Sequence, residues 1–274
     1  MPVRKILIAV KTYPTLSSKY DELVCTAGFL EDGSWIRVYP IQFRKRAFGE
    51  QYKKYDWVEI DLERNTSDFR PETYRPKADT EFHIVGHLDT KRNWAARKQI
   101  VLKHVHFDLE KLIAEAKDIK ICTSLAVFKP KRIIDFVIES VDRDWSKEKL
   151  LSLNQMNIFN SVSETTGKAE VVRKIPYKFS YQFEDCNGVQ STMMIEDWEI
   201  GQLYWNCLKD NEGNEHLACE AVKQKYFYEF VNNKDLHLFL GTTKAFHKRS
   251  RNPFIIIGVF YPEKELVTQT TLFD

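Results

Sequence analysis

The chain has 274 residues, of which 43% are hydrophobic and 13% aromatic, and its 41 basic and 39 acidic residues leave a net charge of +2. This composition excludes a disordered protein, and the charge balance excludes a protein that binds nucleic acid by bulk charge alone. The length exceeds one minimal domain and fits two modest ones.

The five cysteines are odd in number and show no Cys-x-x-Cys spacing, which argues against a disulfide framework and against a cysteine zinc site. The first apolar run, residues 6–10, has five residues and is followed at once by Lys11. It is too short for the apolar core of a signal peptide or for a membrane span. We therefore expect a cytoplasmic protein without a membrane partner.

Four strands are predicted in the first part of the chain, over residues 4–10, 20–30, 35–39 and 56–64. The second and third are joined through Asp32-Gly33, a pair that favours a tight hairpin because glycine accepts positive φ. The strand over 56–64 alternates apolar and polar residues, as a half-buried strand does. Four close strands predict a small N-terminal β-barrel-like domain of the OB or SH3-like kind.

The middle of the chain predicts a strand over 82–88, helices over 91–100 and 109–117, and a hairpin-like pair of strands over 121–128 and 133–141. A helix follows over 146–156, with Ser146 as its N-cap. We assign residues 1–158 to a β-rich domain with accessory helices. Residues 159–174 are polar and without a long apolar period, which is typical of a linker.

The predicted C-terminal domain covers residues 175–266. Strands over 179–183 and 192–195 are joined through Asn187-Gly188, helices cover 197–208 and 217–231, and two strands over 236–240 and 254–260 follow. The order ββααββ indicates an α+β fold. Residues 267–274 then form a flexible tail, since chain ends are frayed unless they are tied down.

The tail contains Gln269, Leu272 and Phe273 in the pattern Gln-x-x-Leu-Phe. This pattern resembles the short peptide by which many DNA polymerases, repair factors and mobile-element proteins hold the bacterial replication sliding clamp. Such a peptide needs an amide for the rim of a pocket and two apolar anchors for a groove. Thr270 and Thr271 depart from the usual pattern. The resemblance implies the sliding clamp as a partner; the alternative is that Leu272 and Phe273 pack on their own domain.

Basic residues alternate with aromatic ones in several short clusters. Such clusters pair cations that neutralise phosphates with flat rings on which bases stack, so we expect DNA as a partner. The alternative is that the rings are core residues and the cations are solvated. The candidate nucleic-acid-binding residues are Arg44, Lys45, Arg46, Lys53, Lys54, Arg92, Trp94, Arg97, Lys248, Arg249 and Arg251.

Catalysis is indicated less directly. On a strand, His104 and His106 would point the same way and offer two ligands to a divalent metal ion; no other cofactor is indicated. Two acidic clusters, Glu59-x-Asp61-x-Glu63 and Glu196-Asp197-x-Glu199, also occur, but neither comes with a convincing lysine to hold the attacking water or the phosphate. No phosphate-binding glycine loop is present.

Together these features predict a DNA-binding accessory protein that is recruited to the replication sliding clamp, in replication, repair, phage defence or mobile-element biology. One alternative is a metal-dependent nuclease or strand-nicking enzyme. A second alternative is a protein-interaction module without a nucleic-acid role.

Overall fold

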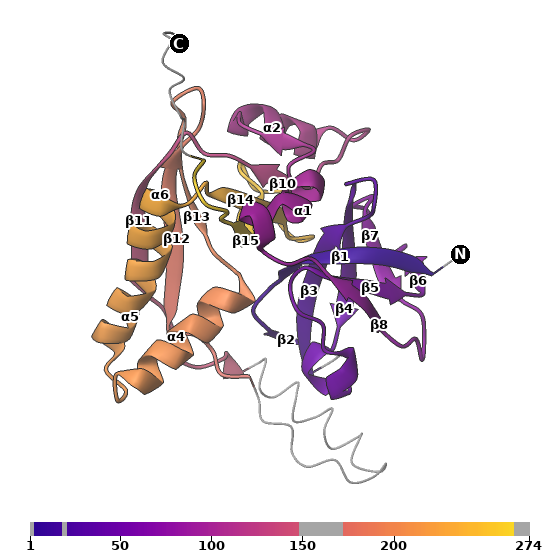
Figure 1. The fold of residues 1–274 in the computed structure, drawn as a ribbon, viewed down its shortest axis with the longest axis horizontal. Coiled ribbons are helices and arrows are strands. Elements are labelled where there is room, and N and C mark those ends of the chain that lie inside the picture. Colours follow the sequence, from indigo (N-terminus) through magenta and orange to yellow (C-terminus); the bar gives the residue numbers. More distant parts are fainter. Residues whose placement is uncertain (1–2, 18–20, 148–171, 266–274) are drawn as a thin grey trace.

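The computed structural model describes residues 3–17, 21–147 and 172–265 of the chain (Figure 1). These residues form an α+β fold with an eight-stranded, a four-stranded and a three-stranded sheet, which confirms the expected fold class. The curled N-terminal sheet lies at one side, the four-stranded sheet lies in the middle, and the three-stranded sheet with its helices lies at the other side (Figure 1).

The N-terminal sheet is an open, curled half-barrel with the strand order β6-β7-β4-β3-β1-β5-β8, and β2 pairs with β3. Two short 3-10 turns, η1 (Phe43–Lys45) and η2 (Phe48–Glu50), connect β4 to β5. The strands are β1 (Arg4–Lys11), β2 (Thr15–Ser17), β3 (Asp21–Phe29), β4 (Trp35–Ile41), β5 (Asp56–Ile60), β6 (Leu62–Arg64), β7 (Thr73–Pro76) and β8 (His83–His87).

The central strand β1 is apolar and buried from Ile6 to Val10, and both of its faces are covered over this stretch. Ile6 and Ile8 face the N-terminal core, which lies within the curled sheet. Leu7 and Ala9 face a second core, which also contains residues from the C-terminal half such as Phe239. We call this second cluster the shared core.

The four-stranded sheet, with the order β15-β14-β10-β9, supplies the other side of the shared core. The helix α1 (Lys91–Val101) precedes β9, and α2 (Leu109–Lys117) follows it. The strands are β9 (Val105–His106), β10 (Leu125–Phe128), β14 (His237–Thr242) and β15 (Phe254–Phe260).

The three-stranded sheet consists of β11 (Arg132–Ser140), β12 (Tyr177–Glu184) and β13 (Gln190–Met194). Helices α4, α5 and α6 cover one face of it (Figure 1). Aromatic residues such as Phe136, Phe179 and Tyr204 fill the C-terminal core between the layers. The helical elements are α4 (Trp198–Asp210), α5 (Glu215–Lys223), the π-helical turn η3 (Gln224–Glu229) and α6 (Phe230–Asn233).

One predicted strand pairing is wrong. The runs over 121–128 and 133–141 do not form a hairpin, because β10 pairs with β14 and β9 whereas β11 pairs with β12 in another sheet. β9, β10 and β11 lie in the expected N-terminal domain, yet none of them pairs with the N-terminal sheet. β9 pairs with β10, β10 also pairs with β14, and β11 pairs with β12. The helix expected over 146–156 and most of the expected linker lie outside the described residues.

Candidate nucleic-acid interface

The loop between β14 and β15 forms two successive turns. The backbone amide of His247 donates to the carbonyl of Thr243 at 3.0 Å, and the amide of Ser250 donates to the carbonyl of Phe246 at 2.9 Å. Pro253, which ends the loop, cannot donate to a strand ladder. The two turns fix the directions in which successive side chains leave the backbone.

His247 anchors this loop from inside. Its side chain is 1% exposed, with Nε2 2.7 Å from the carbonyl oxygen of Ala116 and Nδ1 2.7 Å from Oγ1 of Thr242. Because a carbonyl only accepts, Nε2 carries the proton, and Nδ1 accepts from the Thr242 hydroxyl. Burial lowers the pKa of His247, which favours this neutral tautomer.

Two further contacts tie the loop to the segment between β6 and β7. The buried Arg70 donates to the carbonyl of Thr242 and is itself held by Asp68 at 3.0 Å. Lys244 donates through Nζ to the carbonyl of Ser67. The loop is therefore fixed against both the N-terminal sheet and the end of α2.

These anchors bring together exposed residues from three segments, which we call the basic–aromatic surface. The ring of Phe69 lies 5.2 Å from the ring of His247, and Nζ of Lys248 lies 4.4 Å from the centre of the Phe69 ring. The surface consists of Phe69 after β6; Lys117, Ile119, Lys120 and Ile121 at the end of α2; and Lys244, Phe246, Lys248, Arg249 and Arg251 of the anchored loop.

The apolar side chains of this surface are unusually open to solvent. Phe246 is 59% exposed, Ile119 is 93% exposed and Phe69 is 39% exposed. Exposed apolar groups that gather on one surface and are rimmed by polar groups mark an interaction site more often than a chance arrangement. Aromatic rings in such a position offer flat faces on which unpaired bases stack.

The cations of the basic–aromatic surface are not neutralised by the protein. Among residues 3–17, 21–147 and 172–265, no carboxylate lies within ion-pair distance of Lys117, Lys120, Lys244, Lys248, Arg249 or Arg251. These six cations outnumber Asp118, the exposed carboxylate of the same segments, which favours a positive potential here despite the small net charge of the chain.

The predicted N-terminal cations differ in this respect. Arg44 is paired with Glu22 at 2.8 Å, and Arg46 is near Glu50 and lies 3.5 Å from the centre of the Phe82 ring. Their charges are therefore already engaged within the protein. Lys45 and Lys53, which we also predicted as nucleic-acid ligands, are exposed.

Lys54 does not fit its expected role. Its ammonium is buried, 6% exposed, and lies 2.8 Å from both Oδ2 of Asp197 and Oε2 of Glu199. Burial opposes this charge, yet the two carboxylates raise the pKa of Lys54 above its ordinary value. Lys54 therefore joins the N-terminal sheet to the start of α4 and is out of reach of a phosphate.

Trp94 and Arg97 are packed as well. The Trp94 ring lies between 5.0 and 5.8 Å from the rings of Tyr55, Phe260 and Tyr261. The guanidinium of Arg97 lies 3.8 Å from the centre of the Tyr55 ring, and its Nε donates to the carbonyl of Leu88 at 2.8 Å. Arg97 is buried, and Trp94 is half-buried against the shared core.

Arg92 is exposed but begins a run of three residues in the left-handed region, with φ between 50° and 61° at Arg92, Asn93 and Trp94. Such a run is costly for residues other than glycine and persists only when the surroundings hold it. The packing of Trp94 and the hydrogen bond from Nδ2 of Asn93 to the carbonyl of Glu263 at 2.9 Å hold it here.

The structure thus brings three of the predicted residues together: Lys248, Arg249 and Arg251. Their partners come from distant segments and were not predicted; they are Phe69, Lys117, Ile119, Lys120 and Ile121. An isoleucine between two lysines in the run Lys117-Asp118-Ile119-Lys120 was the one available signal, because an apolar residue is unusual in such a polar turn.

The catalytic candidates are not assembled into a metal site in the described part of the chain. His104 is exposed, and His106 is 3.9 Å from Glu115. No group of three or more His, Cys, Asp or Glu side chains among the described residues is arranged to hold a metal ion. Asp61 and Glu63 are paired with Lys77 and Arg75, so these two carboxylates serve ion pairs on the sheet.

The tail residues Gln269, Leu272 and Phe273 lie outside the described residues, so the clamp-binding prediction stays a prediction. None of the helices in the described ranges has the length and apolar character needed to cross a membrane.

Comparisons with known proteins add two family matches. A family model described as domain of unknown function DUF8758 matches residues 2–103, and another described as domain of unknown function DUF8757 matches residues 105–274. No curated protein matches the chain. A solved structure described as "Structure of murine DNA binding protein bound with ds DNA" is similar at 10% identity over 99% of this chain and 100% of that chain, with a TM-score of 0.31. A TM-score this low carries no conclusion about function.

Proposed function

We propose that this chain, which belongs to the family described as domain of unknown function DUF8757, binds nucleic acid through the basic–aromatic surface. The observation that carries the proposal is the set of six unpaired cations around exposed rings on an anchored loop. Cations without a carboxylate partner can still neutralise phosphates, and exposed rings offer stacking faces for bases.

The anchoring strengthens this inference. His247, Arg70 and Lys244 hold the loop before any ligand arrives, so little ordering entropy is lost when the ligand binds. The same features also suit an acidic peptide, but phosphates spaced along a strand match a run of cations more fully than isolated carboxylates do.

The first test is fluorescence anisotropy of labelled single-stranded and double-stranded DNA at several salt concentrations. We compare the intact chain with the triple variant Lys248→Ala, Arg249→Ala and Arg251→Ala. Each lost phosphate contact lowers the slope of log affinity against log salt by about 0.7–0.9, so the triple variant should lose roughly 2–3 units of slope.

The matched control removes three exposed lysines elsewhere, as Lys103→Ala, Lys209→Ala and Lys225→Ala. It changes the net charge equally and should leave the salt slope close to that of the intact chain. Equal losses in the two triple variants, or no DNA binding by the intact chain, would sink the proposal.

We further propose that the tail recruits the protein to the bacterial replication sliding clamp. The support is the Gln-x-x-Leu-Phe pattern of Gln269, Leu272 and Phe273. A weak tail and a weak nucleic-acid surface on one chain act together, because binding of one raises the effective concentration of the other.

Calorimetry with a purified bacterial sliding clamp tests the tail directly. The intact chain should bind with roughly micromolar affinity, and both the variant ending at residue 268 and the double variant Leu272→Ala and Phe273→Ala should not. If the variants bind as well as the intact chain, or if none of them binds, the recruitment proposal fails while the DNA-binding proposal stands.

A further inference from the structure

A cavity of about 380 Å³ lies beside α4. Its walls come from the segment that follows β11, the segment that precedes β12, and α4 and α5. In Figure 1, α4 lies at the opposite end of the molecule from α2, so this cavity is separate from the basic–aromatic surface. Cavities of about 300–1,000 Å³ are typical of small-molecule sites.

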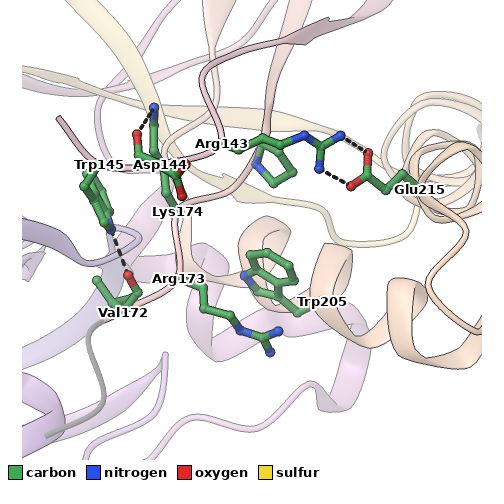
Figure 2. Close-up of a pocket in the computed structure, with 9 residues that line it drawn as sticks. Arg143, Asp144, Trp145, Val172, Arg173, Lys174, Trp205 and Glu215 are labelled. Carbon is green, nitrogen blue, oxygen red and sulfur yellow. Dashed lines mark hydrogen bonds and ion pairs between the residues drawn. The ribbon is translucent and has the colours of Figure 1, made fainter. Parts of the chain in front are cut away.

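Two tryptophans stand on opposite sides of the cavity in Figure 2, and their positions are fixed by hydrogen bonds. Nε1 of Trp145 donates to the carbonyl of Val172 at 2.8 Å, and Nε1 of Trp205 donates to the hydroxyl of Tyr13 at 2.8 Å. The indole faces are therefore preorganised, which reduces the cost of binding a flat ligand between or upon them.

Three cationic side chains line the cavity. A carboxylate neutralises one of them, and the other two have no carboxylate partner in the described part of the chain. Arg143 forms a two-pronged ion pair with Glu215 (Figure 2). The Glu215 carboxylate also accepts a hydrogen bond from Tyr177 at 2.8 Å. In contrast, neither Arg173 nor Lys174 has a carboxylate partner among the described residues. Arg143 shapes the wall, and the other two cations remain available to an anion.

The free cations lie next to aromatic surface. The guanidinium of Arg173 lies 4.4 Å from the centre of the Trp205 ring, and Nζ of Lys174 donates to the carbonyl of Asp144 at 3.1 Å. A guanidinium stacked on an indole is itself a flat, positively charged platform. An adjoining cavity shares Arg143, Asp144, Trp145 and Lys174 and adds Asp142, Ser146 and Lys147, so its lining carries charges of both signs.

We infer that this cavity binds a nucleotide, a ligand that joins a planar base to an anionic phosphate. The base stacks against an indole or against the guanidinium of Arg173, and the phosphate accepts hydrogen bonds from Arg173 and Lys174. An inorganic anion would bind the two cations but would make no stacking contact with Trp145 or with the Arg173–Trp205 pair.

The test uses the intrinsic fluorescence of the intact chain, because two tryptophans line the cavity. Titration with AMP and with ATP should quench this fluorescence with a saturable curve, and inorganic phosphate should compete only at concentrations at least about tenfold higher. The double variant Arg173→Gln and Lys174→Gln should weaken AMP binding at least about tenfold.

Two controls keep the outcome unambiguous. Lys178→Gln removes a cation of β12 that is paired with Glu139 and lies outside the cavity, so it should bind AMP as the intact chain does. The Lys248, Arg249 and Arg251 triple variant should also retain AMP binding, which separates this site from the proposed DNA surface. Circular dichroism establishes that each variant is folded.

Three results would overturn the inference. They are the absence of saturable quenching by either nucleotide, equal affinity for AMP and inorganic phosphate, and unchanged AMP binding by the Arg173 and Lys174 double variant. The first denies a small-molecule site, the second denies that the base is recognised, and the third places binding elsewhere.

Discussion

Lys54 forms a buried ion pair that links the two halves of the chain. Its ammonium is buried between Asp197, which is fully buried, and Glu199. Burial raises the pKa of Asp197 to about 6, and the positive charge of Lys54 opposes this rise. An ion pair of this kind costs desolvation to form but costs more to break on one side, because a buried charge is then left uncompensated.

Replacing Lys54 by methionine should therefore destabilise the protein by about 3–5 kcal/mol in urea unfolding. The neighbouring exposed Lys53→Met should change the unfolding free energy by less than about 0.5 kcal/mol. Adding Asp197→Asn to Lys54→Met should recover part of the loss, since it removes a carboxylate that the first change leaves unpaired. Equal losses of stability in Lys54→Met and Lys53→Met would contradict the role of Lys54 as a buried ion-pair partner.

Lys11 makes the stability of the protein depend on pH, because its pKa is lowered whereas that of Lys54 is raised. Burial, reinforced by the nearby charge of Lys54, lowers the pKa of Lys11 from its ordinary 10.5 to about 8, and Glu199 and Asp197 oppose the shift. Between these two values the unfolded chain holds a proton that the folded chain has released. Stability contributed by Lys11 therefore rises with pH across this window.

Urea unfolding of the intact chain and of Lys11→Met between pH 8 and 10.5 checks this sign. The unfolding free energy of the intact chain, minus that of the variant, should increase by about 1–3 kcal/mol over the window. Subtracting the variant removes the contributions of tyrosines and cysteines that titrate in the same range. A flat or falling difference would show that the burial of Lys11 does not control its charge.

At the scale of elements, the sequence predicts local turns well and long-range strand pairing poorly. The hairpins that turn at Gly33 and Gly188 were expected from short turn motifs, and both glycines have φ above 80°. The pairing of β10 with β14 joins Leu125 to Gly241, and no pattern within either strand encodes that partner. The expected hairpin between 121–128 and 133–141 failed for this reason, because proximity in sequence was the only available guide.

The candidate site also combines residues that the sequence indicates with residues that only the fold brings near them. Lys248, Arg249 and Arg251 stand out in the sequence as a short basic run, whereas Phe69 joins them only through the fold. Lys54 was wrongly expected to bind nucleic acid. Its place in a basic cluster does not reveal that Asp197, 143 positions later, forms a buried ion pair with it. Cations can be found from sequence, but whether each is neutralised depends on tertiary contacts.

The loop between β14 and β15 should depend on His247 more than on its charged residues. His247→Ala leaves the carbonyl of Ala116 buried without a donor, at a cost of about 1–3 kcal/mol. Amide hydrogen exchange from Phe246 to Ser250 should accelerate, and DNA affinity should fall although no charge is removed. Lys248→Ala should weaken DNA binding without altering exchange; slow exchange in His247→Ala would contradict the anchoring role.

At the scale of the whole molecule, the two halves complete one another. The shared core joins Leu7 and Phe29 of the N-terminal sheet to Val127, Phe239 and Phe260 of the four-stranded sheet, and each of these side chains is at most 1% exposed. Because residues of both halves bury one another here, we expect the halves to unfold as one cooperative structure.

A fragment of residues 1–103 should therefore lack a cooperative unfolding transition and should bind the hydrophobic dye ANS, as partly folded chains with exposed apolar surface do. Co-expression with residues 105–274 should restore a soluble complex with a single transition. A fragment of residues 1–103 that unfolds cooperatively at the melting temperature of the intact chain would show that the shared core is not needed.

The shared core also has a consequence for biosynthesis. The strand β1 leaves the ribosome well before Phe239 and Phe260, which cover its Leu7 face, are made. At about 5–20 residues per second, the nascent chain waits roughly ten to fifty seconds with that apolar face uncovered. A newly made N-terminal sheet is thus a natural client for chaperones that shield hydrophobic surface during translation, and slow synthesis would lengthen its exposure.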